Sequence, residues 1–134
     1  IPNSYFTELN GLSDDWIYQR TGIRERVRAS EKETLNYMCQ QAVEMAAQKL
    51  PYGITTVDLI IFASYTPSDT VGTTGHWIQR EFGIENAKVF YISSACSSGM
   101  NAIEAVSAYF AAGLAKRALL IFADRNSSFS DDTV

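Results

Sequence analysis

Three short apolar runs alternate with longer amphipathic segments, and this alternation most constrains the fold. The runs are DLIIFA (58–63), KVFYI (88–92) and ALLIFA (118–123). Short runs rich in β-branched residues are typical of strands buried on both faces of a parallel sheet. The intervening segments carry apolar residues at three- and four-residue steps, which predicts helices. This order predicts an α/β fold whose mostly parallel or mixed sheet has helices on both faces.

The helix before the first run has recognisable ends. Ser30 and Glu33 fit a capping box, so we expect the helix to begin there. It should run for roughly five turns and stop at Pro51, which cannot continue a helix. Cys39 lies in the apolar stripe of this helix and is expected to be a core residue.

Two further helices are expected between the strands. Thr74 can cap a short helix over 75–82, and Gly83 suits the left-handed position after its end. Apolar residues over 100–110 predict another helix, which ends near Gly113.

Composition excludes several classes of protein. The 134 residues have the length of one ordinary domain, and a net charge of -4 argues against a general nucleic-acid or membrane-surface binder. No run approaches the roughly 18 apolar residues of a membrane-spanning helix, and no secretory signal is recognisable, so we expect a cytoplasmic protein. The two cysteines, Cys39 and Cys96, fit neither a disulfide framework nor a metal site.

Cys96 is the first candidate functional residue. It lies in YISSACSSGM, at the expected turn between the strand 88–92 and the next helix. Ligands bind at such turns in open α/β sheets, and the positive end of the helix dipole stabilises a thiolate there. Small neighbouring residues leave room for a substrate carbonyl. We therefore interpret Cys96 as a candidate nucleophile, although a lone cysteine is more often a small buried apolar residue.

Positive charge is concentrated in WIYQRTGIRERVR, residues 16–28. The segment holds four of the eleven basic residues of an acidic chain, Arg20, Arg24, Arg26 and Arg28. Arginine pairs well with phosphate, and Trp16, one helical turn before Arg20, offers a flat face to a nucleobase. The segment thus fits a ligand that contains a nucleotide. The alternative interpretation is a solvated charged loop beside a core tryptophan.

Two stretches together carry a family resemblance. DDWIYQRTGIRERVRA, followed later by SSACSSGMNAI, resembles β-ketoacyl-acyl carrier protein synthase III, and the similarity runs over nearly the whole chain. The resemblance implies a thiolase-like fold. It also implies that residues 1–134 form the amino-terminal half of such an enzyme, with the first strand and the carboxyl-terminal half absent.

The resemblance further implies the roles of individual residues. Cys96 would accept an acyl group from an acyl-coenzyme A, and its amide would be one oxyanion donor. Trp16 would stack on the adenine, Arg20 and Thr21 would hold the nucleotide, and Val71 would line the acyl pocket. The acyl-enzyme would then condense with malonyl-acyl carrier protein, losing carbon dioxide and releasing a β-ketoacyl product of fatty-acid biosynthesis. A homodimer is expected, with acyl-coenzyme A as a substrate and with no cofactor and no metal.

The sequence departs from the family pattern at several positions. Leu12 stands where a coenzyme A-contacting threonine is common, and Gly99 follows the cysteine by three residues where many members have glycine at two. Val71 and Gly72 replace a larger apolar residue and a proline. These departures leave the preferred acyl chain and the pathway open.

Two alternatives to this function remain at the level of sequence. One is a related synthase with a cysteine nucleophile, of the hydroxymethylglutaryl-coenzyme A or polyketide type. The other is a non-catalytic half-domain that dimerises or binds ligand. The resemblance implies that the histidine and asparagine that promote decarboxylation lie in the carboxyl-terminal half. His76, the chain's only histidine, falls in an expected helix and matches no catalytic position of the family. We expect His76 to be a surface or helix-packing residue.

Overall fold

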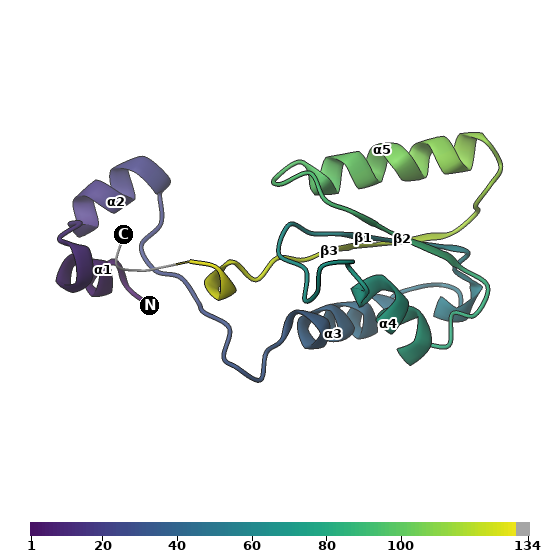
Figure 1. Cartoon of the computed structure of the whole chain (residues 1–134), viewed down its shortest axis with the longest axis horizontal. Coiled ribbons are helices and arrows are strands. Elements are labelled where there is room, and N and C mark those ends of the chain that lie inside the picture. Colours follow the sequence, from purple (N-terminus) through teal and green to yellow (C-terminus); the bar gives the residue numbers. More distant parts are fainter. Residues whose placement is uncertain (131–134) are drawn as a thin grey trace.

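The computed structural model describes residues 1–130, which contain a three-stranded parallel sheet between two helical layers (Figure 1). The strand order is β2-β1-β3, so β1 is central and both other strands are edges. Helices α3 and α4 cover one face and α5 covers the other (Figure 1). The elements of this body are α3 (Leu35–Ala47), β1 (Leu59–Ala63), α4 (Thr74–Glu81), β2 (Lys88–Ile92), α5 (Ser98–Ala111) and β3 (Ala118–Phe122). The predicted fold class and strand order along the chain are confirmed.

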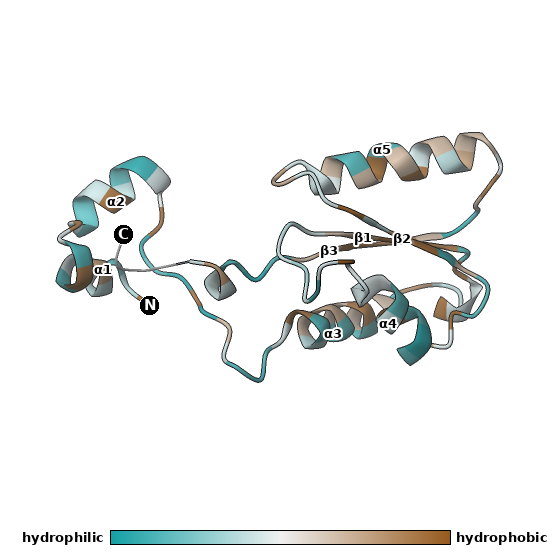
Figure 2. Cartoon of the chain, viewed as in Figure 1, coloured by the Kyte–Doolittle hydropathy of each residue, from teal (hydrophilic) through white to brown (hydrophobic). Residues whose placement is uncertain are grey.

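The central strand anchors the core because all five of its residues are buried. Side chains alternate across a strand, so Ile60 and Phe62 pack with the α3 and α4 side while Leu59 and Ile61 pack with α5. Figure 2 shows the strands as an apolar layer. Each fully buried aliphatic side chain contributes about 1.5 to 3 kcal/mol, which holds both helical layers on one sheet. Cys39 is 1% exposed within this core, as predicted.

The amino-terminal residues form a small helical unit apart from the sheet (Figure 1). It consists of α1 (Asn3–Asn10) and α2 (Asp14–Thr21). Asn3 is 1% exposed, and its side-chain amide donates to Asp14 Oδ1 at 2.7 Å and to the Ile23 carbonyl at 2.8 Å. These bonds tie the two helices together. Sequence reasoning missed α1, which has no side-chain cap and no acidic residue in its first turn.

The predicted start of α3 is wrong by several residues. The helix begins at Leu35, where the Thr34 hydroxyl accepts the Tyr37 N–H at 3.2 Å, and it ends at Ala47 after 13 residues. Ser30 and Glu33 instead form a turn: the Ser30 N–H donates to Glu33 Oε2 at 2.7 Å. Only one half of the expected capping box is therefore present, and it closes a turn before the helix.

The predicted cap of α4 is also wrong. Thr74 is the first residue of the helix, and its hydroxyl donates to Asn36 Oδ1 at 2.7 Å, so it joins α4 to α3. The glycines predicted to end α4 and α5 do adopt positive φ, 61° at Gly83 and 69° at Gly113. Within residues 1–130, no helix is long and apolar enough to cross a membrane.

Asp58 fixes the start of β3 beside the start of β1. Its carboxylate accepts the N–H groups of Lys116, at 2.9 and 3.0 Å, and of Arg117, at 2.9 Å. These hydrogen bonds, the Arg117 N–H first, hold the pKa of Asp58 below its usual value. The sheet is thus clamped at the end opposite to the turn that carries Cys96.

Candidate active site

Cys96 lies exposed in the tight turn that joins the carboxyl end of β2 to the amino terminus of α5. Ala95, directly before it, has φ 48° and is the only residue other than glycine with positive φ among residues 1–130. A left-handed alanine costs roughly 1 to 3 kcal/mol and persists only where the surroundings hold it. Strained strand-to-helix turns of this kind present nucleophiles in other enzymes. The predicted position of Cys96 is confirmed, and its strain could not be read from the sequence.

Serine hydroxyls beside Cys96 bond within the turn. Ser97 donates its hydroxyl to the Ser94 carbonyl at 2.7 Å, and its N–H donates to the same carbonyl at 3.1 Å. Although Ser97 occupies the cap position of α5, its side chain accepts no hydrogen bond from the helix. The positive end of the helix therefore stays free of a side-chain cap next to the thiol.

Asp124 clamps the carboxyl ends of β1 and β3 near this turn. Its Oδ1 accepts from the Ser64 hydroxyl at 3.0 Å, the Tyr65 N–H at 2.9 Å, and both the N–H and the hydroxyl of Thr66, at 3.1 and 3.0 Å. Ser64 and Thr66 are buried. Sequence reasoning missed this cluster, because the bonds join residues nearly sixty positions apart.

Phe122, the last residue of β3, packs against the first turn of α5. A Cβ built on Gly99 would lie 3.6 to 3.8 Å from the Phe122 ring, which is ordinary van der Waals contact, so the ring lies directly beside this turn of the helix. The ring is 51% exposed. An aromatic surface therefore lies one helical turn from Cys96.

The loop before α4 carries the predicted acyl-pocket residue, Val71, which is 70% exposed. Asp69 organises the loop by accepting the N–H groups of Val71, at 3.0 Å, and of Thr73, together with the Thr73 hydroxyl. The Thr73 hydroxyl is the main cause that holds the pKa of Asp69 below its usual value. Within residues 1–130 no hydrogen bond joins Val71 to Cys96, so the role of Val71 in an acyl pocket stays a prediction.

The structure explains the glycine at position 72. Gly72 has φ 67°, and a Cβ there would lie 2.4 Å from ring atoms of Tyr91. Proline, with its φ fixed near −65°, could not adopt this conformation. Tyr91 in turn donates its hydroxyl to the Ser64 carbonyl at 2.7 Å. The glycine that replaces the family's proline at position 72 is therefore explained by its positive φ and by the Tyr91 ring packed against it.

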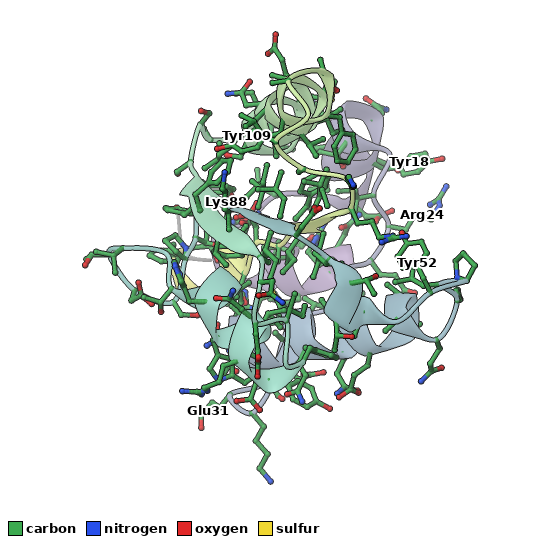
Figure 3. All side chains as sticks on the ribbon, turned by 90° about the vertical axis from the view of Figure 1, so that its right-hand side faces the viewer. Tyr18, Arg24, Glu31, Tyr52, Lys88 and Tyr109 are labelled. Atoms are coloured by element: carbon green, nitrogen blue, oxygen red, sulfur yellow. The ribbon has the colours of Figure 1, made fainter. Side chains whose placement is uncertain are left out.

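The arginines of α2 and the segment after it lie over aromatic rings. The Arg20 Cζ is 4.2 Å from the centroid of the Trp16 ring, and the Arg24 Cζ is 3.9 Å from that of Tyr18. Tyr18 and Arg24 are labelled in Figure 3. Arg26 lies 4.6 Å from the centroid of Phe6 and also donates to Asn3 Oδ1 at 2.8 Å. Arg20 and Arg24 are exposed, as in a solvated charged segment, whereas Arg26 is partly buried. Trp16 is 43% exposed, so it is not the core tryptophan of the alternative interpretation.

The Thr21 side chain, also predicted to bind nucleotide, closes the end of α2. Its hydroxyl donates to the Ile17 carbonyl at 2.8 Å and accepts the Ile23 N–H at 3.1 Å. Gly22 follows with φ 69° and ends the helix. The structure thus brings Trp16, Arg20 and Thr21 together on one short helix.

The two halves of the predicted site belong to different parts of the molecule. The carboxyl ends of the strands and the amino-terminal end of α5 face the α1–α2 unit (Figure 1). No hydrogen bond or ring contact within residues 1–130 joins Cys96 to Trp16 or Arg20.

Other features of the structure lie away from Cys96. A groove of about 520 Å³ lies between α3 and β3, and Cys39 rather than Cys96 lines it. His76 is exposed on α4, as predicted. Among residues 1–130, no three potential metal-ligating side chains lie close enough together to hold a metal ion.

Several known proteins with similar sequences and structures are named synthase III. The chain is 36% identical over 131 residues to β-ketoacyl-acyl-carrier-protein synthase III of Prochlorococcus marinus, covering 98% of the chain and 39% of the relative. It is 38% identical over 133 residues to the protein of that name from Rhizobium rhizogenes, covering 99% and 41%. The crystal structure of 3-oxoacyl-acyl-carrier-protein synthase III from Aquifex aeolicus has a TM-score of 0.90 at 33% identity, covering 98% and 42%. The resemblance to synthase III is confirmed.

The similarity to synthase III has a defined extent. The chain spans about 40% of the length of the curated synthase III relatives it matches, and it corresponds to their amino-terminal part. The fold is thiolase-like. A scan against family models found no match.

Proposed function

We propose that the protein is an acyltransferase that condenses an acyl-coenzyme A with malonyl-acyl carrier protein through an acyl-Cys96 thioester. The observation that supports this most is the exposed Cys96 thiol, presented by left-handed Ala95 at the uncapped amino terminus of α5. The similarity to proteins named synthase III supports the same reaction class.

The first half-reaction is acyl capture. The Cys96 thiolate attacks the thioester carbonyl of the acyl-coenzyme A, and the electron pair of the C=O bond moves to oxygen. When the carbonyl re-forms, the bond to the coenzyme A sulfur breaks, and that sulfur leaves as a thiolate that takes up a proton from water. Exchange of one thioester for another changes the energy little. The N–H group of Cys96 is one donor that stabilises the oxyanion, and we assign the second donor to residues outside this chain.

Coenzyme A is held by the α2 helix in this proposal. Arg20 covers one face of Trp16, so the other face is the surface on which the adenine stacks. The Arg20 guanidinium then lies at the edge of the nucleotide, where it pairs with a phosphate. Thr21 holds the end of the helix in place through its two hydrogen bonds. The α1–α2 unit lies on the side of the sheet where the strands end and α5 begins (Figure 1), and this arrangement supports the assignment.

The second half-reaction forms the carbon–carbon bond. The malonyl group loses carbon dioxide, and the resulting carbanion attacks the carbonyl of acyl-Cys96. The Cys96 thiolate leaves, and the product is a β-ketoacyl group on the carrier protein, a step of fatty-acid biosynthesis. His76 is exposed on α4 and has no place in this step. We assign the groups that promote decarboxylation to residues outside this chain.

We further propose that the chain is the amino-terminal part of a longer condensing enzyme. Four exposed apolar side chains follow one another at steps of three, seven and four residues along and just after α5: Met100, Ile103, Phe110 and Leu114. A row of this kind is typical of a surface that another part of a protein covers. The additional length of the synthase III relatives provides that part.

A homodimer also belongs to this proposal. β2 is an edge of the parallel sheet, and its outer N–H and C=O groups have no strand partner in residues 1–130. Such edges pair readily with a second copy. Light scattering of the purified protein tests this assembly: twice the monomer mass is expected, and a monomer at micromolar concentration contradicts it.

The reaction is tested by separating its two halves. In the longer enzyme, acyl-coenzyme A alone should load one acyl group per chain, and addition of malonyl-acyl carrier protein should then release carbon dioxide and a β-ketoacyl product. Residues 1–134 alone should load the acyl group but release no β-ketoacyl product. Cys96→Ala should abolish both signals because alanine cannot attack a thioester. His76→Ala should leave them within a fewfold of wild type. Steady condensation by Cys96→Ala would refute the proposed nucleophile.

A further inference from the structure

The first residue of α5, Ser98, is 5% exposed although it lies next to an exposed nucleophile. Its hydroxyl makes two short hydrogen bonds within the turn. It accepts the Ser94 N–H at 2.7 Å and donates to the Ala95 carbonyl at 2.7 Å. A hydroxyl can serve as acceptor and donor at once, so both bonds form together.

These two bonds enclose the strained residue of the turn. The Ser94 N–H lies on one side of Ala95 and the Ala95 carbonyl on the other, so Ser98 restrains the backbone on both sides of the φ angle of 48°. The Ser98 N–H adds a bond to the Ala95 carbonyl at 3.2 Å. Without the hydroxyl, the Ser94 N–H would lose its partner, and the left-handed alanine would lose much of the stabilisation that offsets its cost.

Cys96 depends on this restraint because the planar peptide bond joins its Cα to the Ala95 carbonyl, so a rotation at Ala95 moves the whole residue. If Ala95 returned to a negative φ, the direction of the chain at Cys96 would change, and the thiol would leave the amino terminus of α5. We infer that Ser98 is a positioning residue for acyl transfer: its hydroxyl holds Ala95 left-handed and so aims the Cys96 thiol. This inference rests on the proposed function for its kinetic part.

The neighbouring serine provides the matched control. Ser97 also bonds within the turn, through its hydroxyl to the Ser94 carbonyl at 2.7 Å, but it is exposed and does not contact Ala95 through that hydroxyl. Ser98→Ala should lower kcat for acyl loading by about tenfold. This is the change expected when the activation free energy rises by about the free energy of one hydrogen bond. KM for the acyl-coenzyme A should stay within twofold. Ser97→Ala should change neither value by more than about threefold.

A double substitution separates positioning from a general structural role. Glycine adopts positive φ without the cost that alanine bears, so Ala95→Gly should make the hydroxyl dispensable. We expect Ser98→Ala to cost less than about threefold in kcat in the Ala95→Gly background. A loss of equal size in both backgrounds, or a kcat of Ser98→Ala within twofold of wild type, would overturn the inference.

Two measurements keep the inference testable if a variant fails to fold or acyl loading fails. Hydrogen exchange of the wild-type protein should show the Ser94 amide protected, and exchange as fast as in an unstructured peptide would contradict the bond to Ser98. Alkylation of Cys96 by iodoacetamide needs no coenzyme A, and its rate should fall in Ser98→Ala. If wild type is alkylated but never acylated, the proposed function fails while the role of Ser98 is still decided.

Discussion

Brief treatment with iodoacetamide at pH 8 should alkylate Cys96 and leave Cys39 almost untouched. Alkylation requires the thiolate. Burial raises the pKa of the Cys39 thiol from 9.0 to about 11, so at any pH below 9 it holds about one hundredth of the thiolate of an ordinary thiol. Cys39 is also only 1% exposed, which restricts access of the reagent. Labelling of Cys39 should therefore be at least about 100-fold slower than that of an exposed thiol with an ordinary pKa.

Peptide-level mass spectrometry at several short times measures the two rates. Cys39→Ala should leave the labelling of Cys96 unchanged, and in urea both cysteines should react at similar rates. The raised pKa also gives a pH dependence. The stability that comes from keeping the Cys39 thiol neutral is complete below pH 9 and is lost as the pH rises from 9 toward about 11. Similar labelling of both cysteines in a folded sample at pH 8 would refute the reasoning.

Three further predictions test other parts of the structure. Arg20→Ala should weaken coenzyme A binding by about 1.5 to 3 kcal/mol in a calorimetric titration, and Arg24→Ala, which removes a similar ring contact, should change it little; equal effects would contradict the assignment. Asp124→Ala should lower the free energy of unfolding by about 2 to 4 kcal/mol in urea, with a smaller loss in Asp124→Asn, which keeps an acceptor oxygen. Because the pKa of Asp58 is lowered in the folded state, its contribution should be present above about pH 4 and lost in acid, so Asp58→Asn should flatten the acid limb of a stability curve.

The sequence predicts the sheet well because its strands are determined by local composition. β1 is apolar at every position, and the observed bounds of all three strands lie within one residue of the predicted runs. The helix ends were predicted less well. Ser30 and Thr34 are both capable caps, and only the three-dimensional position of α3 against the sheet decides between them.

The candidate site was likewise only partly predictable from the sequence. The location of Cys96 follows from the order of strand, small residues and helix, which the sequence displays. The sequence does not predict the left-handed conformation of Ala95 or the hydroxyl bonds of Ser98. Alanine disfavours positive φ, and a serine in a loop has no fixed hydrogen-bond partner. The Asp124 cluster joins residues nearly sixty positions apart, and such contacts leave no local signal in a single sequence.

The central claim is that Cys96 accepts an acyl group from acyl-coenzyme A. The most direct measurement is mass spectrometry of the protein after incubation with acetyl-coenzyme A, followed by digestion and sequencing of the modified peptide. We expect one acetyl group on the peptide that contains Cys96, released by hydroxylamine as a thioester and missing in Cys96→Ala. An unmodified Cys96, or an acetyl group that persists in Cys96→Ala, would contradict the claim.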